Sequence, residues 1–454
     1  MTTAGVRSPR SEVRTEPPFL PKRRPAVMLA GKLLALAALT ALAGCGGGGG
    51  GGTTTSTPTT PTTVANTIPI AVNSGPANNA INFAYVTVQV CNPGSTTSCA
   101  TIPNVQLDTG SSGLRILSSA SGVNGLSLTQ VAPGGTPIDE CYQFGDGSYV
   151  WGPVMQADVI MAGEKAASLP IQVIDSGTSP SNVPSSCGAG AGANRGTSTL
   201  LQANGILGVG AAQQDCGINC TGTTVQPYYW QCPASGSCVL SSLAAAIQVS
   251  NPVIFFNSDN NGVAVTLSSV GATGAASSSG TLAFGVGTQT DNALGSANIY
   301  PLAFWSSGYY AGAYTIQSTY NSVAYPGFVD SGSSLLFFLD PATTGMSACS
   351  GSYSSLYCPS SNMTFTVSNM GYQGTAANAT INIGNALSLL PSQTNSGFTA
   401  FDNLAAINGT GASNDAIVFG LPFFFGKTVF VGVAGKTPPS GAPSTASADG
   451  YWAF

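Results

Sequence analysis

The chain contains no histidine in its 454 residues. Without this side chain it cannot build a Ser-His-Asp triad, a Cys-His pair or a His-ligated metal site, so most familiar hydrolase mechanisms are excluded. Acidic residues are also scarce, with four Glu and thirteen Asp. Carboxyl groups are the side chains that remain for proton transfer in catalysis, and we expect neither a metal nor a cofactor. Each acidic residue is therefore a candidate for a catalytic role.

Heptads, long amphipathic stretches and basic clusters are missing from the body of the chain too. Hydrophobic residues make up 43% of the chain, and glycine, serine, threonine and proline dominate the rest. This composition favours strands and turns over helices, so the chain is predicted to be mainly β. The lack of basic clusters argues against a nucleic-acid partner. An adhesin-like β sandwich without a catalytic site is the simplest alternative.

Residues 1–44 are predicted to be a lipoprotein signal peptide. Basic residues precede the apolar run at 33–42, which is too short to span a membrane as a mature helix. The run leads into Leu-Ala-Gly-Cys at residues 42–45, which resembles a bacterial lipobox, so Cys45 is the predicted lipidation site. The alternative is ordinary secretory cleavage that leaves Cys45 free. Gly46 stands where lipoproteins retained at the inner membrane usually have Asp, so we expect an outer-membrane lipoprotein of the cell envelope, on its periplasmic or surface face.

Removal of the signal peptide makes the protein distinctly acidic. Seven of the twelve bases lie within residues 1–44, so five bases and fifteen acids remain, a formal net charge of −10. When the acids of such a surface are protonated at low pH, five bases create little positive self-repulsion. We therefore expect the fold to tolerate acid.

The composition divides the mature chain into a tether, two lobes and a tail. Residues 45–79, which begin with seven glycines after the cysteine, are predicted to be a tether that buries no core. The body is long for one core and is predicted to form an N-terminal lobe at 80–248 and a C-terminal lobe at 249–435. Residues 436–454 are predicted to be a flexible tail, whose last aromatics could dock on the core. We expect a monomer.

Ten cysteines remain after Cys45, and an even number in an exported chain predicts five disulfides. Short spacings favour Cys91 with Cys99 and Cys349 with Cys358. The cysteines from 216 to 238 can pair in several ways, and the sequence leaves these open.

An internal repeat supports the division into two lobes. Residues 108–117 align without gaps on residues 330–339, with six of ten positions identical. Each segment begins with an Asp-Thr/Ser-Gly triplet between apolar residues, so Asp108 and Asp330 are equivalent. A third triplet begins at Asp175 but is followed by Ser-Pro after the threonine and lacks the apolar continuation. Asp175 is therefore predicted to lie on a surface turn, outside any active site.

The two repeated segments resemble the pepsin family of aspartic proteases, in which each lobe contributes one Asp-Thr/Ser-Gly loop. The apolar-apolar-Gly segments that pack under these loops in the family match residues 206–208 and 418–420, and residues 144–148 resemble the flap hairpin. The resemblance covers roughly residues 80–435. It implies a mainly β, two-lobed pepsin-like fold with pseudo-two-fold symmetry and a central cleft.

The resemblance also implies an aspartic endopeptidase that acts on polypeptides, with an acidic pH optimum. Asp108 and Asp330 would activate a water molecule between them, and the sequence does not say which is acid and which base. Ser111 and Ser333 match positions that orient the carboxyl groups, and Thr109 and Ser331 match those that brace the loops. The remaining implied site residues are Gly110 and Gly332 in the loops and Phe144, Gly145, Asp146, Gly147 and Ser148 in the flap.

Two departures from the family leave a second function open. The flap usually carries Tyr where this chain has Phe144, although Tyr142 or Tyr149 could substitute. The family often has Trp at the position of Arg115, so the usual partner of the flap is absent. A weakly active or inactive pepsin-like surface protein, acting as a binding or inhibitor module, is therefore the alternative function.

Overall fold

The structure is a computed structural model that describes residues 65–175, 183–187, 193–223, 225–304, 313–390, 397–408 and 415–454. The predicted signal peptide, Cys45 and the first part of the tether lie outside the described residues. Strands dominate the described chain, and the predicted mainly β fold is confirmed. Within this part of the chain, no helix combines the length and apolar character needed to cross a membrane.

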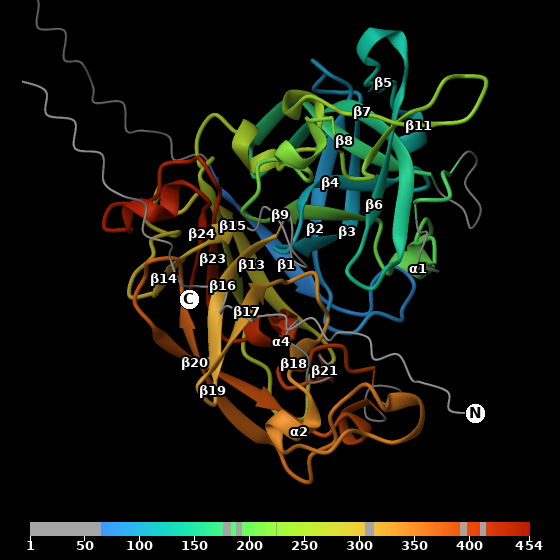
Figure 1. The fold of residues 1–454 in the computed structure, drawn as a ribbon. Coiled ribbons are helices and arrows are strands. Elements are labelled where there is room, and N and C mark those ends of the chain that lie inside the picture. The colour runs from blue at the N-terminus through green and yellow to red at the C-terminus, as the bar shows by residue number, and fades with distance from the viewer. Residues whose placement is uncertain are drawn as a thin grey trace, which may run out of the picture. The chain divides into compact units, whose positions relative to one another are not determined.

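The strands around Asp108 form a continuous run in the order β8-β4-β9-β3-β2 (Figure 1). The pairs β3–β9 and β4–β8 are parallel, and the other neighbours are antiparallel. Asp108 is the last residue of β3, where the chain leaves the sheet. The bounds of these strands are β2 (Ala84–Cys91), β3 (Cys99–Asp108), β4 (Ser112–Leu117), β8 (Glu164–Ile174) and β9 (Gly205–Val209).

The strands around Asp330 repeat this topology in the second lobe. Their order is β21-β18-β22-β17-β16, with β17–β22 and β18–β21 parallel. The repeat in the sequence is therefore a repeat in the fold, and the predicted two-lobed architecture is confirmed. The bounds are β16 (Tyr314–Tyr320), β17 (Val323–Val329), β18 (Leu336–Phe338), β21 (Ala405–Ile407) and β22 (Ile417–Phe419).

The remaining strands of each lobe extend these runs. In the first lobe β6 and β7 form a long hairpin, and in the second lobe β19 and β20 form another. Further strands are β5 (Thr129–Gln130), β6 (Ile138–Gln143), β7 (Tyr149–Met161), β10 (Tyr229–Gln231), β11 (Val239–Leu240), β15 (Ala303–Phe304), β19 (Met363–Met370) and β20 (Ala377–Ile383). The helices are short: α1 (Ser198–Leu201), α2 (Pro341–Thr344) and α4 (Leu421–Phe424).

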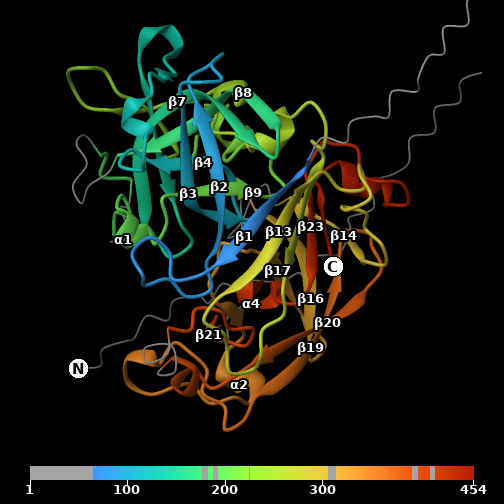
Figure 2. The same ribbon diagram turned by 180° about the vertical axis from the view of Figure 1, so that it is seen from behind.

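A third group of strands, in the order β1-β13-β12-β23-β24-β14, continues the first sheet beyond β2. Figure 2 shows β1 running beside β13, and the two pair antiparallel over six residues. The bounds are β1 (Thr67–Val72), β12 (Gly262–Leu267), β13 (Ser278–Phe284), β14 (Ile299–Pro301), β23 (Thr428–Gly432) and β24 (Tyr451–Ala453).

Two of these strands correct the predicted domain boundaries. β1 lies inside the predicted tether of residues 45–79, because Ile68, Ile70 and Val72 alternate and bury apolar side chains against β13. β24 lies inside the predicted flexible tail of residues 436–454. Its aromatic residues are buried while its backbone pairs with β23 and β14. The residues around both strands are largely polar or small, so the composition of these segments did not predict a strand.

Apolar residues directly beneath the two Asp loops form part of the main core. Leu107 and Leu207 are fully buried in the first lobe, as are Val329 and Phe419 in the second. Burying a side chain of this size contributes about 2 kcal/mol to stability. In each lobe the Asp loop therefore rests on tightly packed apolar side chains that hold its ends in place.

Five disulfides lie within the described residues, as predicted. The bridges Cys91–Cys99 and Cys349–Cys358 confirm the pairings favoured by spacing. The pairings that the sequence left open are Cys141–Cys187, Cys216–Cys220 and Cys232–Cys238.

Candidate active site

Each Asp loop follows a strand that pairs with a parallel strand, and a glycine lies near the end of that partner strand, Gly208 within β9 and Gly420 directly after β22. In the first lobe Asp108 is in register with Gly208 of β9. In the second lobe Val329, which precedes Asp330, is in register with Phe419, which precedes Gly420. Both loops therefore leave their sheets from equivalent positions.

The carboxyl groups of the two aspartates are held by equivalent donors. The backbone N–H of Gly110 and the hydroxyl of Ser111 donate to Asp108 at 2.8 and 2.5 Å. Equivalent donors at residues 332 and 333 reach Asp330 at 2.8 and 2.6 Å. In each loop the backbone N–H donates to Oδ1 and the hydroxyl to Oδ2. These contacts fix the rotamer of each carboxyl group.

The two loops are braced against each other by reciprocal hydrogen bonds. The backbone N–H of Ser331 donates to Oγ1 of Thr109 at 2.9 Å, and the backbone N–H of Thr109 donates to Oγ of Ser331 at 3.1 Å. Each hydroxyl then donates to the carbonyl of the opposite strand, at Val329 and at Leu107. Both side chains are buried, so these bonds tie the lobes together at the floor of the site.

The loops lie so close together that each glycine faces the opposite carboxyl group. A Cβ atom added to Gly110 would lie 2.5 Å from Cγ of Asp330, and one added to Gly332 would lie 2.5 Å from Oδ1 of Asp108. The carboxyl groups of Asp108 and Asp330 therefore lie close together, near enough for Asp330 to act on the ionisation of Asp108. The structure therefore brings together the two aspartates that the repeat singled out, 222 positions apart in the sequence.

This contact changes the ionisation of the pair. Burial, followed by the negative charge of Asp330, raises the pKa of Asp108 to about 7, although the Ser111 hydroxyl and the Gly110 N–H lower it. Two adjacent carboxyl groups cannot both ionise cheaply, and their protons titrate as a coupled pair. The carboxyl group of Asp108 consequently keeps its proton up to about pH 7.

The aspartates lie in a cleft of about 870 Å³. It is lined from both lobes, by Phe83 and Tyr228 on the first and by Tyr314 and Phe337 on the second. Thr109, Gly110, Ser111, Gly332 and Ser333 also line it. The aromatic walls and the length of the lining segments suit an extended chain with apolar side chains.

The predicted flap is the turn between β6 and β7. The N–H of Phe144 donates to the carbonyl of Ser148, and Gly147 occupies the left-handed region at φ +81°, which closes a tight turn. The predicted residues Phe144, Gly145, Asp146 and Ser148 line the cleft. Gly145, Asp146 and Gly147 are exposed at the tip, where the N–H of Gly147 donates to the carbonyl of Phe144.

Arg195 is a site residue that the sequence gave no reason to select. Its guanidinium donates to the carboxylate of Asp146 at 2.8 Å and to Oγ of Ser148 at 3.1 Å. Burial raises the pKa of Asp146, but the hydroxyl and the N–H of Ser148, followed by the charge and hydrogen bond of Arg195, outweigh it and lower the pKa. The tip of the flap is thus clamped to the segment before α1. No local pattern signals a contact between residues so far apart in sequence.

A family model described as "Protein of unknown function (DUF3443)" matches residues 62–454. The chain belongs to this family. A search of curated proteins gave no match. The crystal structure of an aspartic proteinase from Irpex lacteus is similar with a TM-score of 0.48 and 16% sequence identity, covering 85% of this chain and 96% of that chain.

In this member of the DUF3443 family Asp175, the first residue of the third Asp triplet, is not among the described residues that line the cleft. Asp175 follows β8, is half-buried, and donates its backbone N–H to the carbonyl of Trp151. Its charge acts on Asp139, whose pKa is raised to about 6 by burial first and by Asp175 second.

Asp139 also belongs to the one cluster of potential metal ligands among the described residues, together with Cys232 and Cys238. These two cysteines form a disulfide, so they offer no thiolate to a metal. The cluster is not a metal site.

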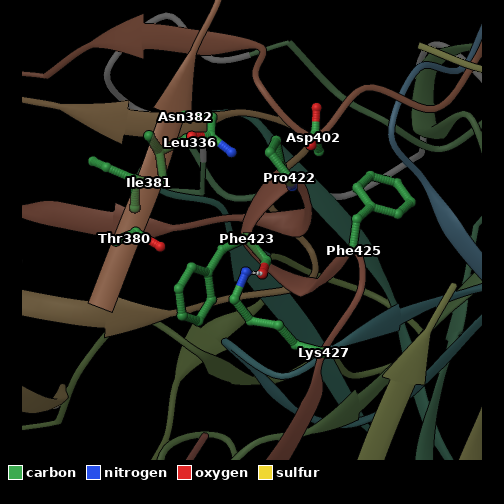
Figure 3. A pocket seen from close by; sticks show the side chains of 9 residues that line it. All are labelled: Leu336, Thr380, Ile381, Asn382, Asp402, Pro422, Phe423, Phe425 and Lys427. Atoms are coloured by element: carbon green, nitrogen blue, oxygen red, sulfur yellow. Dashed lines mark hydrogen bonds between the residues drawn. The ribbon is translucent and has the colours of Figure 1, made fainter. Parts of the chain in front are cut away.

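A much smaller cavity of about 60 Å³ lies beside α4 in the second lobe (Figure 3). Nζ of Lys427 donates to the carbonyl of Phe423 at 2.9 Å and lies 4.5 Å from the centre of its ring. Asp402 lines the other side, and burial raises its pKa. The volume holds about four water molecules, so this cavity cannot take a peptide.

Proposed function

We propose that this protein is an aspartic endopeptidase. One observation carries the proposal: two carboxyl groups, one from each lobe, lie close together and are held by equivalent donors at the floor of a large cleft. Such a pair shares one proton, so one member is a base and the other an acid at the same pH. A merely structural turn requires no such arrangement.

The reaction follows from the shared proton. A water molecule held between Asp108 and Asp330 loses a proton to the ionised carboxylate and attacks the carbonyl carbon of a peptide bond. The protonated carboxyl group gives its proton to the carbonyl oxygen, and no covalent intermediate forms. The carboxyl group that took the water proton then gives it to the leaving nitrogen, and the C–N bond breaks. A hydroxyl group of the tetrahedral diol returns its proton to the other carboxylate, which restores the pair and leaves a carboxylic acid product. Because Asp108 loses its proton near pH 7, activity is expected below that pH.

The cleft and the flap would hold the substrate. The aromatic residues that line the cleft, including Phe83 and Tyr314, would contact apolar substrate side chains. The exposed N–H groups of Gly145 and Asp146 would bind the extended substrate backbone like an added strand. Phe144 has no hydroxyl group, so the flap would close over the substrate by packing and backbone contacts.

We further propose that the enzyme is anchored to the cell envelope through a lipid on Cys45. Incorporation of labelled palmitate into the protein in growing cells tests this proposal. The Cys45→Ala variant would lose the label. Labelling that persists in this variant would contradict the proposal.

The proposed activity is tested by digestion of oxidised insulin B chain between pH 3 and 8, followed by mass spectrometry. We expect cleavage in acid by the wild type, and at least a thousandfold loss in Asp108→Asn and in Asp330→Asn. Asp175→Asn is the matched control and should retain activity. Equal cleavage by the wild type and both single variants would refute the assignment of the pair.

A further inference from the structure

Arg115 is fully buried seven residues after Asp108, at a position where the pepsin family often has Trp. Its Nη2 donates to Oε1 of Glu140 at 2.6 Å and to Oδ2 of Asp215 at 2.7 Å. Its Nη1 donates to the carbonyl of Ser112 at 3.0 Å. The side chains of both acids are also fully buried. A charged cluster therefore lies directly behind the wall of the cleft.

This cluster joins three elements that surround the proposed active site. Arg115 is on β4, which follows the Asp108 loop, and Glu140 is on β6, the first strand of the flap hairpin. Asp215 lines the cleft and accepts a 2.5 Å hydrogen bond from the hydroxyl of Tyr229. One guanidinium thus fixes the flap strand and a cleft wall relative to the catalytic loop.

A second contact of Arg115, with the ring of Tyr142, links the charged cluster to the flap tip. The guanidinium carbon lies 3.7 Å from the centre of the Tyr142 ring, on the same face of β6 as Glu140. The Tyr142 ring packs edge-on against Phe144, with centroids 5.5 Å apart, and both residues line the cleft. A continuous chain of contacts runs from β4 through Arg115 and Tyr142 to the flap.

Stability alone does not require an ionic cluster at this place. Apolar side chains of similar volume commonly replace buried ion pairs without loss of stability. Here Nε of Arg115 and Oε2 of Glu140 are buried without a hydrogen-bond partner, which adds to the cost of the cluster. What the cluster supplies instead is a fixed direction for the Tyr142 ring.

We propose that Arg115 is a positioning residue that sets the resting place of the flap through Tyr142 and Glu140. The inference rests on the proposed function, because a set distance between flap and aspartates matters for holding a substrate. Arg115 does not touch the reacting atoms. It substitutes for the missing Trp partner by presenting a cation, rather than an indole, to an aromatic ring two residues before Phe144.

The test is hydrogen exchange measured by mass spectrometry on the full mature protein, a readout that needs no substrate. Tyr142→Leu removes the ring and leaves the ion pairs of Arg115 intact, so the variant should fold. We expect amides of residues 141–148 to exchange at least tenfold faster, while β12 and β13 exchange as in the wild type. Tyr142→Phe keeps the aromatic face and should exchange as the wild type does. Arg115→Lys, which cannot bond both acids and cover the ring at once, should also loosen the flap.

Kinetics on insulin B chain separate positioning from chemistry. Tyr142→Leu should raise KM at least fivefold and lower kcat by a smaller factor. Unchanged flap exchange in Tyr142→Leu, or acceleration spread evenly over the whole first lobe, would overturn the inference. If the wild type cleaves nothing but Tyr142→Leu selectively loosens the flap, the positioning role stands and the proposed endopeptidase function fails.

Discussion

The carboxyl group of Asp108 experiences opposing influences on its pKa. Burial and the charge of Asp330 raise the pKa, whereas the hydroxyl of Ser111 and the N–H of Gly110 lower it by stabilising the ionised form. The outcome, about 7, sets the upper pH limit of the proposed chemistry. Any change in one donor should therefore move that limit.

Ser111→Ala should move the alkaline limb of the pH–rate profile upward. Removing the hydroxyl takes away a donor to the ionised carboxylate, so the pKa of Asp108 rises further. A hydrogen bond to a charged group is worth about 1.5–3 kcal/mol, which corresponds to a displacement of about one pH unit or more. The measurement is kcat/KM on a peptide substrate from pH 5 to 9. Ser112→Ala, which loses only a bond to the carbonyl of Ala212, is the control and should leave the limb in place.

Gly332→Ala should displace the opposite carboxyl group. Its new Cβ would lie 2.5 Å from Oδ1 of Asp108, much closer than van der Waals contact. We expect at least a hundredfold loss of kcat with retained secondary structure, measured by peptide hydrolysis and circular dichroism. Gly125→Ala, where an added Cβ meets nothing within 4 Å, should behave as the wild type. Full activity of Gly332→Ala would mean that the carboxyl pair need not be held in this geometry.

At the scale of elements, the flap hairpin is held at two levels. Its tip is clamped by Arg195, and its base by the contacts of Arg115 with Glu140 and Tyr142. The tip clamp is solvent-accessible, with the side chains of Arg195 and Asp146 36% and 57% exposed. An exposed ion pair is weak and sensitive to salt, so the tip can open while the base remains fixed.

Arg195→Gln should weaken substrate binding more than turnover. Loss of an exposed pair is worth about 0.2–1 kcal/mol, so KM should rise by a factor of about 1.4 to 5 with kcat nearly unchanged. The wild-type KM should rise with added NaCl, and that dependence should be smaller in the variant. Lys165→Gln removes another ion pair of the same lobe, with Asp158, and is the matched control. Identical salt dependence of KM in wild type and Arg195→Gln would contradict the clamp.

Local patterns predicted the elements that depend on neighbours in sequence. The Asp loops, the flap turn and the two short cysteine pairs are all visible as spacing, because their residues contact within a few positions. β1 was assigned to the tether because its partner β13 lies more than 200 positions away. The contact of Arg195 with Asp146 spans 49 positions, so local sequence could not predict it either. The proximity of Asp108 and Asp330 was predicted only because the segment is duplicated.

At the scale of the whole molecule, buried carboxyl groups set how stability depends on pH. The pKa values of Asp108 and Asp139 rise from 3.8 to about 7 and about 6 in the folded protein, and burial also raises those of Glu140, Asp175, Asp402 and Asp449. The folded state binds these protons more tightly than the unfolded state. Their contribution is fully present below about pH 4 and is lost as the pH rises through about 7. The lowered pKa values of Asp146, Asp158 and Asp340 act in the opposite direction.

The carboxyl groups with raised pKa values outnumber those with lowered values. We therefore expect the free energy of unfolding to be higher at pH 5 than at pH 8. Each unit by which the folded pKa exceeds the unfolded pKa is worth about 1.4 kcal/mol. Urea denaturation at both pH values measures the difference directly. In Asp139→Asn, which removes one contributing carboxyl group, the difference should shrink. A protein that becomes more stable from pH 5 to pH 8 would show that the lowered pKa values dominate.

Every one of the five bridges joins a cysteine to the next cysteine along the described chain. A thiol that reacts with the first partner to appear during synthesis therefore already makes the native bond. Reshuffling of wrong bonds, which is slow without a catalyst, is not needed. We expect a thiol oxidase alone to produce the mature protein, with equal yields from cells that have and lack a disulfide isomerase.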